Sequence, residues 1–160
     1  MKRREQIGLA LARANQTERR RNPEPLHLVA CGSSKLDHAA PARELYTGDL
    51  FQKARAYVEA RGARWFILSA VHGLVDPLAV LEPYDCWIGA QDRAWRDDWG
   101  QRIAAQLERH ERRAWPFSAP IVALAGKDYR EPLERAGIEL RAPMAGLAIG
   151  LQKAWLASHT

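Results

Sequence analysis

The apolar residues of this chain fall into short runs that alternate with stretches of helical spacing. Residues 26–31, 64–70 and 120–125 are mostly apolar, as is typical of strands buried on both faces of a sheet. Residues 49–61 and 91–113 repeat their apolar positions every three or four residues, which predicts two amphipathic helices. Strands that alternate with helices predict a largely parallel sheet covered by helices on both faces.

The segments between and after these elements complete the predicted domain. Residues 71–77 contain glycine and proline and are expected to form a loop, and residues 138–141 predict a shorter strand. A closing helix is expected at 146–157, where the residues expected to pack against the core are Leu147, Ile149, Leu151, Trp155 and Leu156. We therefore predict one three-layer α/β domain over residues 26–160, with a largely parallel central sheet of about four strands flanked by helices.

Residues 1–25 are predicted to be a basic helical arm and its linker. Residues 5–19 have the spacing of a moderately amphipathic helix, and the two prolines at 23 and 25 end it. The arm carries the whole net charge of +5, through Lys2, Arg3, Arg4, Arg13, Arg19, Arg20 and Arg21. Such an arm could contact the phosphates of a nucleic acid, or it could be a solvated helix used for solubility or homodimerisation.

Cysteine usage and hydropathy indicate the compartment. Cys31 and Cys86 are too few for a disulfide framework, and the chain has no charged-then-apolar leader. No apolar run approaches the roughly 20 residues that span a bilayer. We expect a soluble protein of the reducing cytoplasm that does not bind membranes.

Polar residues follow each of the three apolar strands. In parallel sheets, ligands bind beyond the carboxyl ends of the strands, where the loops are free to carry chemistry. The candidate binding residues in these three loops are Gly32, Ser33, Ser34, Lys35, Ser69, Gly73, Gly126, Lys127 and Tyr129. We expect the loops to meet around one crevice.

The first loop, Cys31–Lys35, offers a thiol, hydroxyls, backbone amides and a cation. This mixture suits an anion or the polar edge of a nucleobase, but it lacks the Gly-to-Lys spacing of a P-loop. A tight turn with a buried cysteine is the simpler interpretation. Alternatively, Lys35 and His72 could activate Cys31 as a nucleophile. Cys31, His72 and Cys86 lack the usual spacing of zinc ligands, so we expect no metal and no cofactor.

The segment around Tyr84 combines aromatic rings with carboxylates. Tyr84 and Trp87 could stack a base, while Glu82 or Asp85 orients water or stabilises a positively charged sugar. The alternative is a capped turn whose aromatic side chains face the core.

Several separated motifs resemble those of known families. The motifs are Ser69-Ala70-Val71-His72-Gly73-Leu74, Pro77, Pro83-Tyr84-Asp85, Leu45-Tyr46-Thr47-Gly48 and Gly126-Lys127-Asp128-Tyr129. In this order they resemble a family of uncharacterised bacterial and phage proteins and, more distantly, the YaaA peroxide-stress proteins, over about residues 26–156. The matched positions are Cys31, Ser33, Lys35, Tyr46, Ser69, Gly73, Tyr84, Asp85, Gly126, Lys127 and Tyr129.

The resemblance implies a function that involves nucleobases. YaaA proteins are described as DNA-binding and protective against oxidative damage. Related modules of archaeal tRNA-modifying proteins are similar to uracil-DNA glycosylases. The helix-hairpin-helix element described for YaaA proteins has no counterpart here.

The residues and the resemblance lead to one main hypothesis, an enzyme that hydrolyses the N-glycosidic bond of a modified or damaged base. Asp85 or Asp128 would stabilise the cationic transition state or activate water. Lys35 and Lys127 would hold phosphate. The alternatives are a non-catalytic DNA-binding protein of oxidative stress that binds through its arm, and a nucleotide-sensing module of a defence system.

Overall fold

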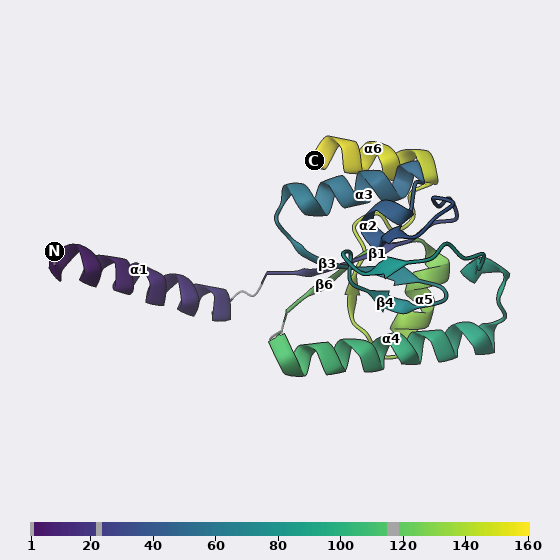
Figure 1. Cartoon of the computed structure of the whole chain (residues 1–160). Coiled ribbons are helices and arrows are strands. Elements are labelled where there is room, and N and C mark those ends of the chain that lie inside the picture. The colour runs from purple at the N-terminus through teal and green to yellow at the C-terminus, as the bar shows by residue number, and fades with distance from the viewer. Residues whose placement is uncertain (1, 22–23, 115–118) are drawn as a thin grey trace.

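A single five-stranded sheet forms the centre of the domain, in the order β4-β3-β1-β6-β7 (Figure 1). The computed structural model describes residues 2–21, 24–114 and 119–160, and the side chains of 4–17, 24–110 and 119–160. The strands are β1 (Leu26–Ala30), β3 (Arg64–Ser69), β4 (Gly73–Val75), β6 (Ile121–Leu124) and β7 (Leu140–Arg141). β1 pairs in parallel with both β3 and β6, and β6 pairs in parallel with β7. The predicted largely parallel α/β architecture is confirmed.

Helices cover both faces of this sheet. The long helices are α1 (Lys2–Arg21), α3 (Asp49–Ala60), α4 (Arg93–Ala114), α5 (Lys127–Arg135) and α6 (Ile149–His159). In Figure 1, α3 and α6 lie above the sheet, α4 and α5 lie below it, and α1 extends away from the body. The short elements are α2 (Ala42–Leu45), the two-stranded sheet of β2 (Ala40–Pro41) and β5 (Val80–Leu81), and the 3₁₀ helix η1 (Ile88–Ala90).

The central strand explains why both faces are buried. Leu26 and Leu28 of β1 pack into the core on the α4 and α5 side, whereas Val29 packs with α3 and α6 on the other side. Successive side chains of a strand point to opposite faces, so one apolar run serves two cores. Within the described residues, no helix is long and apolar enough to cross a membrane.

Two expectations are corrected by the fold. The predicted loop 71–77 contains β4, which pairs antiparallel with β3, because the three residues between these strands are too few for a parallel crossover. On α6, Ile149 and Leu151 are 63% and 59% exposed instead of packed. The helix turns its buried face elsewhere, so that Leu156 is fully buried.

Candidate functional site

A cavity of about 390 Å³ opens at the carboxyl ends of β1 and β6. Within the sheet, β3 lies next to β1 on one side and β6 lies next to β1 on the other. The strand order therefore reverses between β1 and β6. Such a reversal is where open α/β sheets bind their ligands. Two of the three predicted strand-end loops meet here, through Cys31–Ser34 and Ala125–Gly126, together with Tyr129.

Backbone contacts hold the first loop against the cavity. The amide of Thr47 donates to the carbonyl of Ser34, and the amide of Leu36 donates to the carbonyl of Leu45. Gly32 adopts a φ of 84°, a conformation that glycine accepts readily, and a Cβ added there would meet no atom within 4 Å. Gly32, Ser33 and Ser34 are thereby exposed along one wall.

Three helices begin at this cavity without a side-chain cap. Gly48 precedes α3, Gly126 precedes α5 and Ala148 precedes α6, and none of these residues makes a capping hydrogen bond through its side chain. Gly48, Gly126 and Ile149 line the cavity. The first amides of each helix have no partner within the helix, and the helix dipole places partial positive charge there. The cavity is therefore favourable for an anion.

Asp49 of α3 and Lys153 of α6 line the cavity where these two helices begin. The Oδ2 of Asp49 lies 3.1 Å from the Nζ of Lys153, and its Oδ1 lies 2.8 Å from the Nζ of Lys53. Asp49 and Lys153 both line the cavity. The hydrogen bond from Lys53 is the largest cause that lowers the pKa of Asp49, and the hydrogen bond from Lys153 adds to it. Asp49 is therefore ionised at neutral pH.

A chain of hydroxyl groups lies beside the cavity. The hydroxyl of Tyr84 lies 2.6 Å from the Oγ of Ser69 and 2.7 Å from the hydroxyl of Tyr46. It also donates to the Sγ of Cys31 at 3.9 Å, and that sulfur lies 3.4 Å from the hydroxyl of Tyr129. Since Tyr84 has a single hydroxyl proton, Ser69 and Tyr46 donate to it when Tyr84 donates to Cys31.

This hydroxyl chain remains protonated. Burial is the largest cause that raises the pKa of Tyr46, Tyr84 and Tyr129, and repulsion from Cys31 adds to it. Ser69 is fixed because its Oγ accepts from the amide of His72 and its carbonyl accepts from the indole of Trp99. Of these hydroxyl groups, the one that lines the cavity is the neutral phenol of Tyr129.

Lys35 and His72 lie against the ring of Tyr84. The Nζ of Lys35 lies 4.4 Å from the centre of that ring and donates to the carbonyl of Ser33 at 3.2 Å. The His72 ring meets the Tyr84 ring edge-on, with centroids 5.3 Å apart. Cys31 contacts the hydroxyl of Tyr84, so the tyrosine separates the members of the hypothesised Cys31–His72 pair. Among the described residues, no group of three or more His, Cys, Asp or Glu could hold a metal ion.

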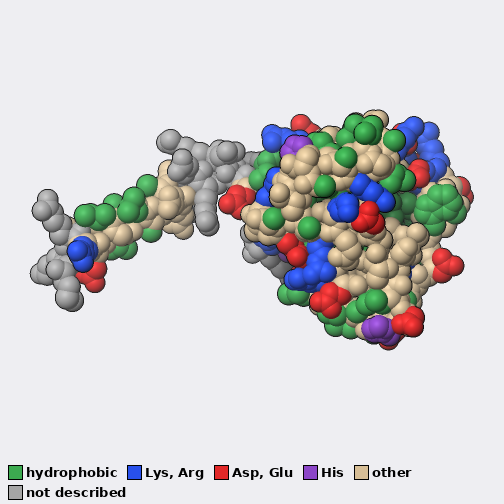
Figure 2. All heavy atoms as spheres, turned by 90° about the horizontal axis from the view of Figure 1, so that it is seen from above, with side chains coloured by type: hydrophobic (Ala, Val, Ile, Leu, Met, Phe, Trp, Pro, Cys, Tyr) green, Lys and Arg blue, Asp and Glu red, His purple; other side chains and the backbone are tan. Residues whose placement is uncertain are grey.

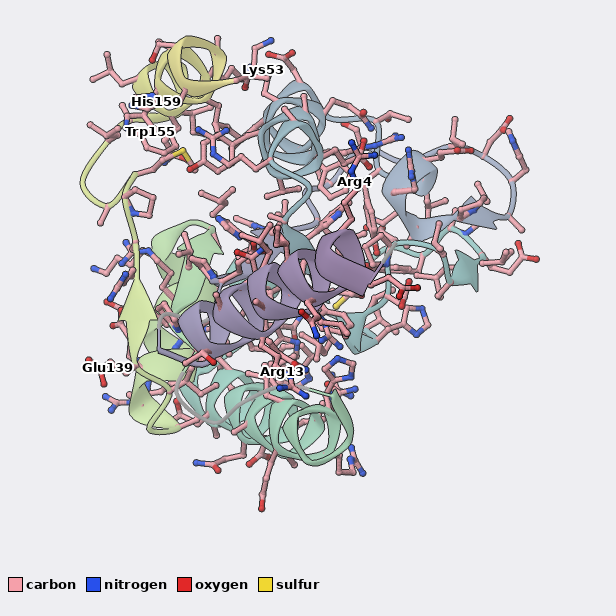
Figure 3. The ribbon with its side chains drawn as sticks, turned by 90° about the vertical axis from the view of Figure 1, so that its left-hand side faces the viewer. Arg4, Arg13, Lys53, Glu139, Trp155 and His159 are labelled. Atoms are coloured by element: carbon pink, nitrogen blue, oxygen red, sulfur yellow. The ribbon has the colours of Figure 1, made fainter. Side chains whose placement is uncertain are left out.

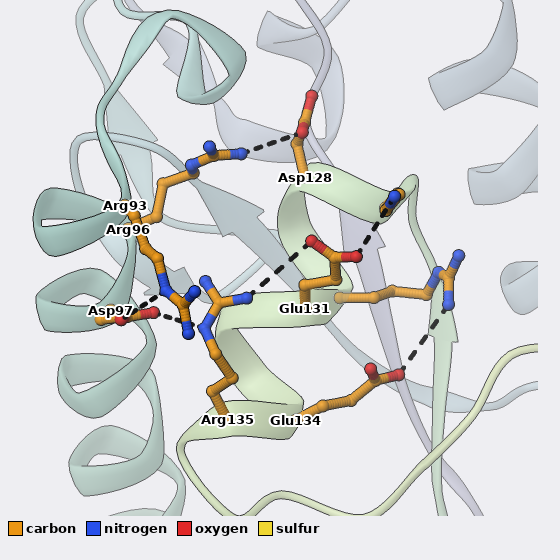
Figure 4. Close-up of polar contacts among 9 residues, drawn as sticks. Arg93, Arg96, Asp97, Asp128, Glu131, Glu134 and Arg135 are labelled. Atoms are coloured by element: carbon orange, nitrogen blue, oxygen red, sulfur yellow. Dashed lines mark hydrogen bonds and ion pairs between the residues drawn. The ribbon is translucent and has the colours of Figure 1, made fainter.

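The two carboxylates predicted to act on a sugar lie outside the cavity lining. Asp128 pairs with Arg96 across α4 and α5, at 3.0 Å (Figure 4). Asp85 is exposed. Lys127 pairs with Glu131 at 3.4 Å and does not line the cavity, although it stands at the first position of α5.

Further predicted residues are divided between the core and the surface. Tyr84 faces the hydroxyl chain, as the alternative interpretation of its segment expected, but Trp87 is 63% exposed. The ring of Trp87 lies over Gly89, where an added Cβ would come within 2.6 Å of it. Gly73 is buried under Gln106, away from the cavity lining.

Several cavity residues were not predicted from the sequence. They are Gly48, Asp49, Phe51, Met144, Gln152 and Lys153. Asp49, Phe51, Gln152 and Lys153 lie on helices that were predicted, but a helical repeat does not indicate which end of a helix lies next to the end of a distant strand. Gly48 and Met144 lie in the connecting segments. The uncapped start of α3, with Gly48 before Asp49, is the one local signal.

Comparison with known proteins gives a family but no activity. No curated protein matches this chain. Residues 26–158 match the family of unknown function DUF6884. The match runs from the start of β1 to the last turn of α6 and does not include α1. The match covers most of the chain and the entire cavity, and the chain therefore belongs to the DUF6884 family.

Proposed function

We propose that this domain binds a phosphorylated nucleoside, free or within a nucleic acid, in the strand-end cavity and hydrolyses its N-glycosidic bond. The observation that carries the proposal is the meeting of three uncapped helix starts with aromatic and hydroxyl side chains around one cavity of about 390 Å³. Its size lies within the range of about 300 to 1,000 Å³ that is usual for small-molecule sites.

The phosphate is assigned to the helix starts. Unpartnered amides of α3, α5 and α6 and the ammonium of Lys153 favour an anion there. Asp49 adds one negative charge, but two lysines contact it, so this corner keeps a net positive charge. Figure 2, seen from the α6 side, shows acidic and basic side chains interspersed on this face. Binding thus depends on the cavity itself and not on a basic surface.

The base is assigned to the wall of the cavity at the end of β1. Phe51 and Tyr129 supply aromatic surface, and Ser33 and Ser34 supply hydroxyls and exposed amides for its polar edge. When Tyr84 donates to Cys31 and the thiol donates to Tyr129, the hydroxyl proton of Tyr129 is free for the ligand.

The reaction replaces a carbon–nitrogen bond with a carbon–oxygen bond. The bond from C1′ to the base breaks, and its electron pair leaves with the base. Water adds to C1′, and a proton from that water ends on the released base. The bound phosphate offsets the charge of the two lysines, so the ionised carboxylate of Asp49 can stabilise the positive charge that develops on the sugar. Asp49 takes the role that the sequence suggested for Asp85 or Asp128.

The test measures the release of free base by mass spectrometry. The substrates are nucleoside 5′-monophosphates and oligonucleotides with modified bases. We expect Asp49→Asn to lower the rate of release about 100-fold or more. The matched control is Asp98→Asn, an exposed aspartate on α4, which should leave the rate unchanged. No release from any substrate, or equal rates for both variants, would contradict the proposed reaction.

A separate measurement tests binding. Calorimetry should show that a nucleoside 5′-monophosphate binds more tightly than the nucleoside. Lys153→Gln should remove most of this difference, whereas Lys53→Gln should remove less because Lys53 contacts Asp49 but does not line the cavity. If phosphate brings no gain, the assignment of the helix starts is wrong.

The position of α1 favours a second candidate function, nucleic-acid binding through the arm. α1 stands away from the body in Figure 1, and Arg4 and Arg13 on it are exposed. Phosphate contacts of such an arm would weaken with salt and would not read base sequence. Deletion of residues 1–22 should then abolish retention on duplex DNA at low salt. Equal retention by the shortened chain would exclude this function for the arm.

A further inference from the structure

A second, larger cavity lies at the amino ends of the strands, opposite the first cavity. Its volume is about 550 Å³, and it lies where β1 and β6 begin, beneath α3 and α6. Figure 3 faces these strand ends, with Trp155 on α6 among the side chains there. β1 separates it from the first cavity, because His27 near the start of the strand lines one and Cys31 after its end lines the other.

Flat apolar surface forms the interior of this second cavity. His27 and Val122 are register partners on β1 and β6 and both line it. The rings of Tyr57 and Trp155 lie beside each other, with centroids 5.4 Å apart. Rings and a branched side chain make a slot suited to a planar apolar group.

His27 is a buried polar side chain, and one of its two ring nitrogens has no partner among the described residues. It is 6% exposed, and its Nδ1 makes no hydrogen bond to any described residue. Burial, followed by the nearby charge of Arg61, lowers its pKa against the opposing effect of the Pro25 backbone, so the ring is neutral at pH 7. Buried polar groups in folded proteins nearly always have a partner, and a ligand or an ordered water commonly supplies it.

Two arginines at the rim give the cavity a positive charge. Arg141 is exposed and makes no ion pair with a described residue. Arg61 lies over the ring of Tyr57, with its guanidinium carbon 3.7 Å from the ring centre. Arg61 donates to the carbonyls of Tyr57 and His159, which carry no compensating charge. Glu24 is the single carboxylate among the described lining residues. A guanidinium without a carboxylate partner is a good binding group for an anionic ligand.

We propose that this cavity is a second binding site, for a small molecule that has a planar aromatic body and one carboxylate. The body would lie between Tyr57, Trp155 and the floor at His27 and Val122, and the carboxylate would pair with Arg141. Arg61 already donates to two carbonyls, so Arg141 is the free guanidinium of the described lining. One guanidinium matches the single charge of a carboxylate better than the double charge of a phosphate, so a carboxylate is favoured. The site does not depend on the function proposed for the first cavity.

The test is an NMR titration of the full chain with 2-naphthoate, 2-naphthyl phosphate and neutral 2-naphthol. We expect naphthoate to bind at least tenfold more tightly than naphthol and more tightly than the phosphate. The indole signal of Trp155, assigned with Trp155→Phe, and the ring signals of His27 should shift. Arg141→Gln should remove the advantage of naphthoate over naphthol.

Two matched variants make the outcome decisive. Arg109→Gln removes an exposed arginine on α4 and should not change binding, whereas Ala142→Leu narrows the cavity and should weaken all three probes. The proposal is overturned if Arg141→Gln and Arg109→Gln behave alike, or if the phosphate binds best. It is also overturned if the shifts appear at Gly126 and Tyr129, or if millimolar naphthoate shifts no signal of this cavity.

Discussion

The hydroxyl of Tyr84 and the Oγ of Ser69 lie 2.6 Å apart, although 15 positions separate them in the chain. This contact joins the end of β3 to the segment that follows β5, and it continues to Tyr46 and Cys31. Tyr84 is thus the centre of a polar cluster that connects four separate parts of the chain.

Removing the hydroxyl of Tyr84 should destabilise the fold. In Tyr84→Phe, Ser69 and Tyr46 lose their shared partner in a buried setting, which should cost about 1 to 3 kcal/mol in the free energy of unfolding. Urea denaturation measures this cost. Tyr57→Phe is the control, because the hydroxyl of Tyr57 makes no described hydrogen bond, and its stability should stay within about 0.5 kcal/mol of the parent. Equal losses in both variants would contradict the role of Tyr84.

Gly73 should not tolerate a side chain. Its φ is 72°, and an added Cβ would come within 2.4 Å of the Oε1 of Gln106, which accepts from the amide of Leu74. Gly73→Ala should therefore cost about 1 to 3 kcal/mol in thermal or urea unfolding. Gly150→Ala on α6 has open space and helical backbone, so it should be neutral or stabilising. A neutral Gly73→Ala would show that the turn before β4 relaxes freely.

The two faces of α6 should respond differently to truncation. Leu156 is fully buried, and Leu156→Ala should cost about 2 to 5 kcal/mol. Leu151 is 59% exposed, so Leu151→Ala should change the free energy of unfolding by less than about 0.5 kcal/mol. If Leu151→Ala proves as costly as Leu156→Ala, then α6 buries the other face.

The ion pair of Asp128 should contribute little to stability. Asp128 is about half exposed, and Asp128→Asn should cost at most about 1 kcal/mol, with a smaller effect at high salt. Base release should be unaffected, because Asp128 lies outside the cavity lining. If Asp128→Asn greatly lowered base release without changing stability, Asp128 would take part in the reaction.

Acid should weaken the fold through His27. Burial lowers its pKa below 6.5, so the unfolded chain binds more protons than the folded one as the pH falls below that value. This contribution is fully present above pH 6.5 and is lost as the pH falls through the lower pKa of the folded state. NMR titration of the His27 ring measures that midpoint directly. A midpoint at or above 6.5 would contradict the effect of burial.

Apolar patterning predicted the sheet and its helices because each buried strand carries its signal within a few residues. Thus 26–31 and 64–70 correspond to β1 and β3. The cavity was predicted only in part, since Cys31–Ser34 and Gly126 follow strands whereas Asp49 and Lys153 reach it from helices. Packing between distant segments decides which helix begins next to the end of a strand, and a local sequence pattern does not show this. The second cavity was not predicted, because no local sequence pattern indicates it. His27 lies within an apolar strand, and its sequence neighbours do not mark it as a binding residue.

The pairing of β1 on both sides has a further consequence. Its amides and carbonyls bond to β3 and β6 at once, so they cannot be released without breaking the sheet in two. The amides of Leu28 and Val29 should therefore be among the slowest to exchange with deuterium. A ligand in either cavity therefore contacts a part of the sheet that does not move. Substitutions in the helices over each cavity can change which ligand binds while this part of the sheet stays the same.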